Sequence, residues 1–228
     1  AGPWAICRAK RAINLAGIIG RRGGIPATQP AARCPRAGLV HVARGNVGGK
    51  IFDLARYPDP GQLMDELHAM NIRLMVSIWP LMRGGPNTKE MAAAGFLLGD
   101  SSSGAGAVYD AFHPDARALY WRQARDGYWR YGIDAWWSHC ADCAEPFEAD
   151  WQGSEKPEPW EQRLIDVAEF KNYLNPESIN AYSLQHARGL YEHQLRDSLH
   201  RRMLNLTRSA YPGQQRYGTV CWPGDVSA

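Results

Sequence analysis

The sequence has no long hydrophobic run, few cysteines and little excess charge of either sign. No stretch approaches the roughly 18 to 20 apolar residues of a membrane-spanning helix, and no signal-peptide pattern is present. The 5 cysteines among 228 residues are odd in number and scattered, which favours a reducing compartment, the cytoplasm, over a disulfide framework. The 26 basic and 23 acidic residues leave a net charge of +3 and form no basic stripe. We therefore expect neither a membrane nor a nucleic acid as partner, and the sequence leaves the oligomeric state open.

A glycine-rich phosphate-binding loop is also absent after every predicted strand, which argues against a doubly wound nucleotide-binding sheet. Strands and helices alternate without a hairpin signal, which is typical of βαβ units and a parallel sheet. The α/β pattern therefore predicts a (β/α)8 barrel, with the Gly/Ser-rich residues 81–107 as a loop. Predicted strands are 39–43, 72–79, 133–139, 203–208 and 218–222, and predicted helices are 12–19, 62–71, 113–130 and 176–200.

The predicted strand at 133–139 is the centre of interest, because a short apolar run stops there at a patch of acids and aromatics. Asp142 and Glu145 follow within six residues, and Trp151 within 12. In α/β barrels the active site lies at the C-terminal ends of the strands, so this patch is a candidate site. The simpler alternative is a helix cap or a surface loop. The 9 Trp and 10 Tyr are equally ambiguous, since large aromatic side chains stack on sugars but also fill cores.

Several motifs together resemble glycoside hydrolase family 31, a family of α-xylosidases and α-glucosidases, and most closely its bacterial α-xylosidases. They are Gly132-Ile-Asp-Ala-Trp-Trp137 with Glu145-Pro-Phe147, Asn205-Leu-Thr-Arg208 and Trp222-Pro-Gly-Asp225, in the family's order and roughly its spacing. The resemblance covers residues 57–228, whereas 1–56 match poorly. It implies a partial catalytic barrel of about the first six β/α units, lacking the last strands. It also implies a retaining α-glycosidase that removes terminal α-linked xylose or glucose from an oligosaccharide and needs no cofactor.

The same resemblance assigns roles to individual residues. Asp142 matches the catalytic nucleophile and Asp225 the general acid/base. Retaining hydrolysis requires two such carboxyl groups about 5 to 5.5 Å apart, one ionised and one protonated. The expected substrate-binding residues are Arg208 and the aromatic side chains Trp137 and Trp222, together with Trp79, which the predicted strand 72–79 presents at the same rim.

The chain departs from the family pattern directly before the expected nucleophile. Four residues, 138–141, separate Trp137 from Asp142 where the family has one, and His139 occupies the expected slot. If the strand register follows the tryptophans, histidine replaces the nucleophile, and the chain is an inactive carbohydrate-binding relic or a non-functional fragment. If the register follows Glu145, a bulge or a longer strand end restores Asp142, and we favour this second register.

Two further observations complete the expectations. Residues 27–47 contain none of the acids with which the family's second strand usually contacts the sugar. His139, Cys140 and Cys143 include one Cys-x-x-Cys pair without a second, which is weak evidence for zinc because a structural site needs four ligands. We therefore expect no metal.

Overall fold

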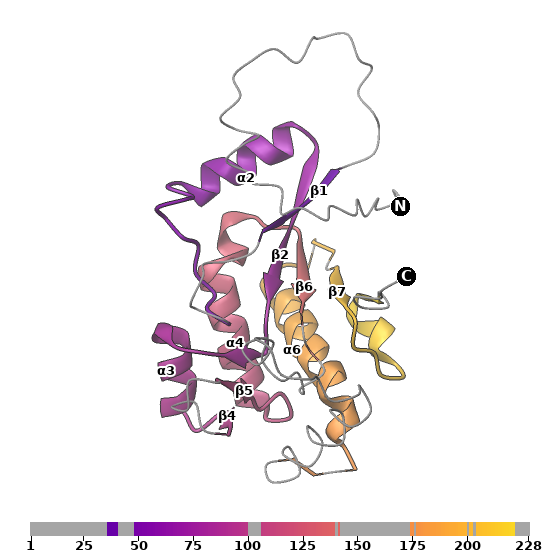
Figure 1. Cartoon of the computed structure of the whole chain (residues 1–228). Coiled ribbons are helices and arrows are strands. Elements are labelled where there is room, and N and C mark those ends of the chain that lie inside the picture. The colour runs from indigo at the N-terminus through magenta and orange to yellow at the C-terminus, as the bar shows by residue number, and fades with distance from the viewer. Residues whose placement is uncertain are drawn as a thin grey trace, which may run out of the picture.

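The computed structural model describes residues 48–99, 106–139, 141, 174–175, 177–199, 201–202 and 204–221, together with the backbone of 36–40. Its centre is a five-stranded sheet in which every neighbouring pair is parallel, in the order β1, β2, β6, β7, β8 (Figure 1). This agrees with the (β/α)8 prediction, in which these are the second to sixth strands. The bounds are β1 (Arg36–Val40), β2 (Ile72–Ile78), β6 (Ala135–Ser138), β7 (Asn205–Thr207) and β8 (Thr219–Cys221).

Helices connect these strands, as parallel neighbours require. Helix α2 (Pro60–Ala69) precedes β2, α4 (Pro114–Gly127) precedes β6, and α6 (Tyr182–Asp197) precedes β7. Short 3-10 turns complete the connections: η2 (Trp129–Tyr131), η4 (Ile179–Ala181) and η5 (Gln214–Tyr217). In Figure 1, α4 and α6 lie together behind β2, β6 and β7.

The ends of α2 follow from its sequence. The Asp59 side chain accepts a hydrogen bond from the Gln62 N–H at 2.9 Å, and Pro60 occupies the first helical turn, where its missing N–H is no loss. The helix therefore begins two residues before the predicted start. Asn71, with φ of 56°, takes the left-handed conformation just beyond the helix and turns the chain into β2.

The core lies between the sheet and the helices. Strand β2 is buried from Leu74 to Ile78, as expected for a parallel strand covered on both faces. Trp136 of β6 is fully buried, and its indole N–H donates to Gln194 Oε1 of α6 at 3.0 Å. Trp121 and Trp129 pack around it with ring centroids 6.2 and 6.4 Å away. These three tryptophans are structural.

Asp134 joins β2 to the start of β6 at the N-terminal edge of the sheet. Its carboxylate accepts hydrogen bonds from the Leu74 N–H at 2.9 Å and from Arg73 at 3.2 Å, and it lies 2.9 Å from His68 Nε2. Its side chain is only 9% exposed. Such a carboxylate fixes the register between the two strands through charge-assisted bonds.

The prediction of a loop at residues 81–107 was wrong, and so was the expectation that no hairpin occurs. A second sheet, of order β3-β5-β4, is antiparallel and carries a short helix. The Gly/Ser content indicated a loop, but Met82, Met91 and Val108 are buried and hold these short elements against the core. The bounds are β3 (Leu81–Met82), α3 (Gly85–Ala93), β4 (Leu97–Leu98) and β5 (Ala107–Tyr109).

The other boundaries are close to prediction. The strands at 72–79, 133–139, 203–208 and 218–222 are confirmed with shorter limits, and the helices at 62–71, 113–130 and 176–200 are confirmed by α2, α4 and α6. Strand β1 lies three residues earlier than predicted. The predicted helix at 12–19 lies outside the described residues.

Candidate active site

The candidate site lies at the C-terminal edge of the parallel sheet. Trp79 follows β2, His139 follows β6 and Arg208 follows β7. Because the strands are parallel, these positions fall at one edge. The chain between β2 and α4 leaves from this edge, so α3 and the small antiparallel sheet lie beyond it (Figure 1).

The register places the aromatic side chains on one face of the sheet. Ser77 pairs with Trp137, and Trp137 pairs with Leu206. Side chains alternate along a strand, so the face that holds Trp137 also holds Trp79 and His139. The neighbouring Trp136 points the other way, into the helix layer, where it reaches α6.

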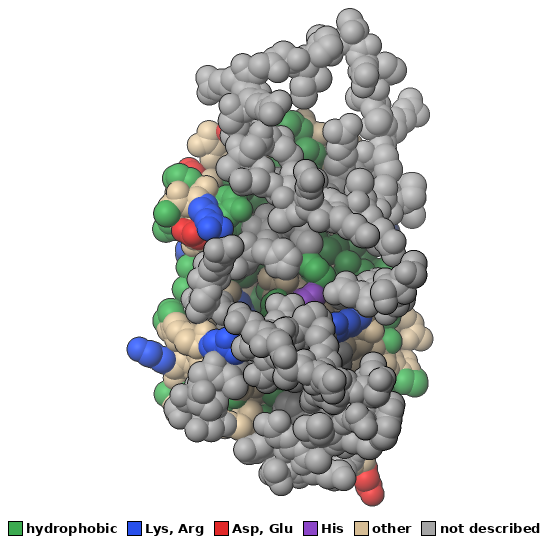
Figure 2. All heavy atoms as spheres, viewed as in Figure 1, with side chains coloured by type: hydrophobic (Ala, Val, Ile, Leu, Met, Phe, Trp, Pro, Cys, Tyr) green, Lys and Arg blue, Asp and Glu red, His purple; other side chains and the backbone are tan. Residues whose placement is uncertain are grey.

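Trp79, His139 and Trp137 form an aromatic cluster at the strand ends. The His139 ring centroid lies 4.5 Å from that of Trp79, with the planes inclined at 49°, and 4.4 Å from that of Trp137, at 82°. The His139 N–H donates to the Ile78 carbonyl at 2.9 Å, which continues the pairing of β6 with β2 by one residue. All three side chains are partly exposed. On the face drawn in Figure 2, hydrophobic and histidine side chains gather near the middle, with Lys and Arg side chains to either side.

The backbone at Trp79 is fixed from the helix layer. The Tyr120 hydroxyl of α4 donates to the Trp79 carbonyl at 2.8 Å, and the Tyr109 N–H donates to the Pro80 carbonyl at 3.2 Å. The two tyrosine rings stack with centroids 4.3 Å apart. Burial raises the pKa of both hydroxyls far above the usual range, so both remain protonated donors.

Tyr109 extends this buried network to α6. Its hydroxyl lies 2.8 Å from Nδ1 of His186, a fully buried histidine. Burial lowers the pKa of His186 to about 3, so the imidazole is neutral at physiological pH and accepts this hydrogen bond. The network is therefore a structural support and carries no charge.

Two serines at the strand ends differ in their partners. The Ser138 hydroxyl donates to Asn205 Oδ1 at 2.6 Å and ties β6 to β7 on the helix side. Ser77 is 5% exposed, and its hydroxyl has no hydrogen-bond partner within the part of the chain that the structure describes. It lies on the same face as the aromatic cluster.

A family model for the glycosyl hydrolases family 31 TIM-barrel domain matches residues 43–228. The chain belongs to glycosyl hydrolase family 31.

Curated relatives of this family 31 chain include two glycosidases. An uncharacterized family 31 glucosidase of Pseudescherichia vulneris is 33% identical over 192 residues, which cover 79% of this chain and 33% of that protein. An α-xylosidase of Saccharolobus solfataricus is 33% identical over 185 residues, covering 77% of this chain and 22% of the relative. The chain thus spans a third or less of the length of these relatives.

Solved family 31 structures share the fold. An α-xylosidase from a soil metagenome, complexed with xylose, superposes with a TM-score of 0.64 at 30% identity, covering 85% of this chain and 28% of that one. An α-xylosidase of Xanthomonas citri gives a TM-score of 0.63 at 27% identity, covering 83% of this chain and 21% of the other. The (β/α)8 barrel architecture, present here in part, is thereby confirmed.

Some of the predicted site residues lie among the described residues, and others do not. Trp79 and Trp137 meet through His139, and Arg208 lies at the same edge of the sheet. Asp142, Asp225 and Trp222 lie outside the described residues, as do Cys140 and Cys143. Among the described residues, no group of three or more His, Cys, Asp or Glu is placed to hold a metal ion. None of the described helices is long and apolar enough to cross a membrane.

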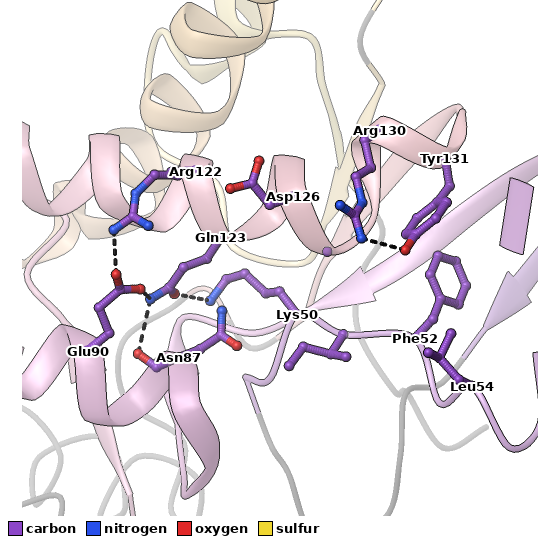
Figure 3. A pocket seen from close by; sticks show the side chains of 12 residues that line it. Lys50, Phe52, Leu54, Asn87, Glu90, Arg122, Gln123, Asp126, Arg130 and Tyr131 are labelled. Carbon is purple, nitrogen blue, oxygen red and sulfur yellow. Dashed lines mark hydrogen bonds and ion pairs between the residues drawn. The ribbon is translucent and has the colours of Figure 1, made fainter.

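A pocket of about 370 Å³ lies apart from the aromatic cluster, whose residues do not line it. It is bounded by the segment 50–54, α3 and α4. Figure 3 shows a polar wall, in which Glu90 bonds Arg122 at 2.6 Å and Gln123 at 2.9 Å, and a more apolar wall that includes Phe52.

Lys50 lines this pocket and is only 1% exposed. Its amine donates to the Gly48 carbonyl at 3.1 Å and to Gln123 Oε1 at 3.3 Å, and it lies 3.8 Å above the Tyr120 ring. No carboxylate lies within ion-pair distance of it in the described residues. Burial therefore lowers its pKa to about 7, although Glu90 partly opposes this effect.

Proposed function

We propose that the chain is the catalytic part of a retaining α-glycosidase that removes terminal α-linked xylose from an oligosaccharide. The observation that carries this proposal is the aromatic cluster at the C-terminal edge of a family 31 barrel. Indole rings offer apolar faces against which the C–H face of a sugar stacks. Xylose is preferred over glucose because the relatives include proteins named α-xylosidase, one of them complexed with xylose.

The proposed reaction is a double displacement. Asp142 attacks the anomeric carbon, and Asp225 protonates the leaving oxygen, which gives a covalent glycosyl-enzyme and the free aglycone. Asp225 then deprotonates a water molecule that releases the sugar with retained configuration. Trp79, Trp137, Arg208 and Trp222 bind the sugar at the strand ends.

Two organisational expectations belong to the same proposal. We keep residues 57–228 as the catalytic barrel and 1–56 as its N-terminal part, while the family match begins ahead of this boundary, at residue 43. We also retain the cytoplasm as the compartment, because the 5 cysteines are odd in number and scattered.

Kinetics of single variants test the catalytic roles. Asp142→Ala is expected to abolish turnover of every α-xyloside, since no covalent intermediate forms. Asp225→Ala is expected to slow xylosides with poor leaving groups most, and to spare the first step with an activated aryl xyloside, whose leaving group needs little protonation. Full activity of Asp142→Ala on both substrates would refute the proposal.

One observation favours a second candidate, a non-catalytic sugar-binding protein. The bond from the His139 N–H to the Ile78 carbonyl continues the β6 register from the tryptophans, and this register puts histidine in the nucleophile slot. On this hypothesis the wild-type chain binds xylose but does not hydrolyse xylosides, and His139→Asp creates activity. On the enzyme hypothesis the wild type is active, and deletion of residues 139–141, which moves Asp142 into the slot, leaves measurable hydrolysis of aryl xylosides.

A further inference from the structure

The side chain at the centre of the aromatic cluster is His139, to which the family resemblance gives no sugar-binding role. It has come to lie between Trp79 and Trp137 because β6 pairs in register with β2 through to its last residue. The imidazole is partly exposed, so it stands at the surface of the cluster and is not sealed in the core. A sugar that stacks on either indole would therefore lie within reach of the imidazole.

The two indoles supply apolar faces, but a sugar ring also presents hydroxyl groups that lose hydrogen bonds to water when they bind. Each hydroxyl both donates and accepts, and a neutral imidazole offers one donor and one acceptor nitrogen. A binding site that leaves these hydroxyl groups without hydrogen-bond partners binds the sugar poorly, because the bonds lost to water are not replaced. Among the described residues, His139 is a polar side chain whose ring contacts both indoles.

A second polar group points to the same place. Ser77 pairs with Trp137 and shares its face of the sheet, and it is 5% exposed. Its hydroxyl lacks a hydrogen-bond partner among the described residues. Buried hydroxyls are nearly always hydrogen-bonded to protein, water or ligand, so the Ser77 hydroxyl is available to bond a polar molecule that enters this face of the sheet.

We propose that His139 is a sugar-contacting residue, whose imidazole, positioned by Trp79 and Trp137, hydrogen-bonds a hydroxyl group of the terminal pyranose. The inference rests on the proposed function, since it concerns the same sugar site. It holds whether or not Asp142 is the nucleophile, because binding at the tryptophans precedes either outcome. His139 is thus assigned to affinity and orientation, and its removal affects KM more than kcat.

Two substitutions separate hydrogen bonding from packing. His139→Phe keeps a flat ring between the indoles but removes both nitrogens, whereas His139→Asn keeps a donor and an acceptor but removes the ring. Loss of one sugar hydrogen bond is expected to weaken xylose binding by His139→Phe about tenfold, with a smaller loss for His139→Asn. His193→Asn, a histidine on α6 bonded to the Gly189 carbonyl, is the matched control and should bind xylose as the wild type does.

The experiment titrates the full chain with xylose and follows tryptophan fluorescence and the histidine Hε1 resonances. The His139 resonance is assigned by its absence in His139→Phe, and thermal melts establish that each variant is folded. In the wild type this resonance should shift with the same saturation curve as the fluorescence, while the other histidine resonances stay in place. Kinetics with an aryl α-xyloside should show a raised KM and a little-changed kcat for His139→Phe.

The outcomes distinguish the two proposals. If the wild type binds xylose while the His139 resonance is unmoved and His139→Phe binds equally well, this inference is wrong and the proposed function stands. If the wild type neither binds xylose nor hydrolyses xylosides, the proposed function fails, and the role of His139 fails with it.

Discussion

The buried amine of Lys50 should make the stability of the chain depend on pH in a particular direction. Its pKa is about 7 in the folded chain against 10.5 in the unfolded chain. Between these values the unfolded state binds more protons than the folded state, so the free energy of unfolding rises with pH. Below pH 7 the amine is charged in both states, and the folded state bears the full cost of burying that charge.

The size of the effect follows from the two pKa values. The 3.5 pH units between them, at about 1.36 kcal/mol each, amount to about 5 kcal/mol over the whole window. Between pH 6 and pH 9.5 the expected gain from this amine alone is about 3 kcal/mol. No reduction for solvent screening applies, because the side chain is 1% exposed.

Lys50→Met isolates this contribution, since methionine is of similar length and carries no charge. Urea unfolding followed by tryptophan fluorescence gives the free energy of unfolding at each pH. The difference in the free energy of unfolding, wild type minus variant, should rise by about 3 kcal/mol from pH 6 to pH 9.5, because titrations that the two proteins share cancel. Lys89→Met, at an exposed position of α3, is the control, and its difference should stay within about 0.5 kcal/mol. A difference between wild type and Lys50→Met that did not change with pH would refute this prediction. The amine would then be exposed to water or paired with a negative charge.

Three further substitutions test other contacts. Asp134→Ala removes a carboxylate that joins two strands and leaves a buried backbone N–H unpaired, so urea unfolding should show a loss of about 3 kcal/mol. Tyr120→Phe removes the bond to the Trp79 carbonyl but keeps the ring stack, so it should cost about 1 kcal/mol and raise KM for an aryl xyloside severalfold, and an unchanged KM would disconnect the tyrosine from the site. Gly127→Ala would drive a Cβ into the carbonyl oxygen of Lys50, so calorimetry should show a loss of about 3 kcal/mol, whereas Gly61→Ala, whose Cβ would lie 3.3 Å from the Asp59 carboxylate that caps α2, should cost less than about 1 kcal/mol.

The parallel core of the fold could be predicted from the sequence because its signals are local. Strand β2 is a continuous apolar run that ends at Pro80, and α2 carries its own cap residue and first-turn proline. The insertion at 81–109 could not be predicted in the same way. Its two- and three-residue strands are too short to establish a period, and they are held by burial of Met82 and Val108 against distant parts of the chain.

The candidate site was predictable to a similar degree. The position of Trp79 and Trp137 at one strand edge follows from two strand ends and the parallel direction. The imidazole contact between them depends on the register beyond Trp137, which the sequence left open between two alternatives. The hydrogen bond of Tyr120 had no local signal, because its partner lies 41 residues away in the chain. Long-range hydrogen bonds of this kind leave no periodicity in the sequence.

The hydrogen bond from the Tyr109 N–H to the Pro80 carbonyl has a consequence for engineering the protein. It brings the two ends of the segment between β2 and α4 together, at 3.2 Å, so this segment is an excursion that leaves the barrel and returns to it at one point. Closing a longer excursion adds only about 0.6 kcal/mol for each doubling of its length. The segment can therefore be exchanged as a unit between family 31 proteins, which would change the chain beside the candidate site while β2 and α4 keep their positions.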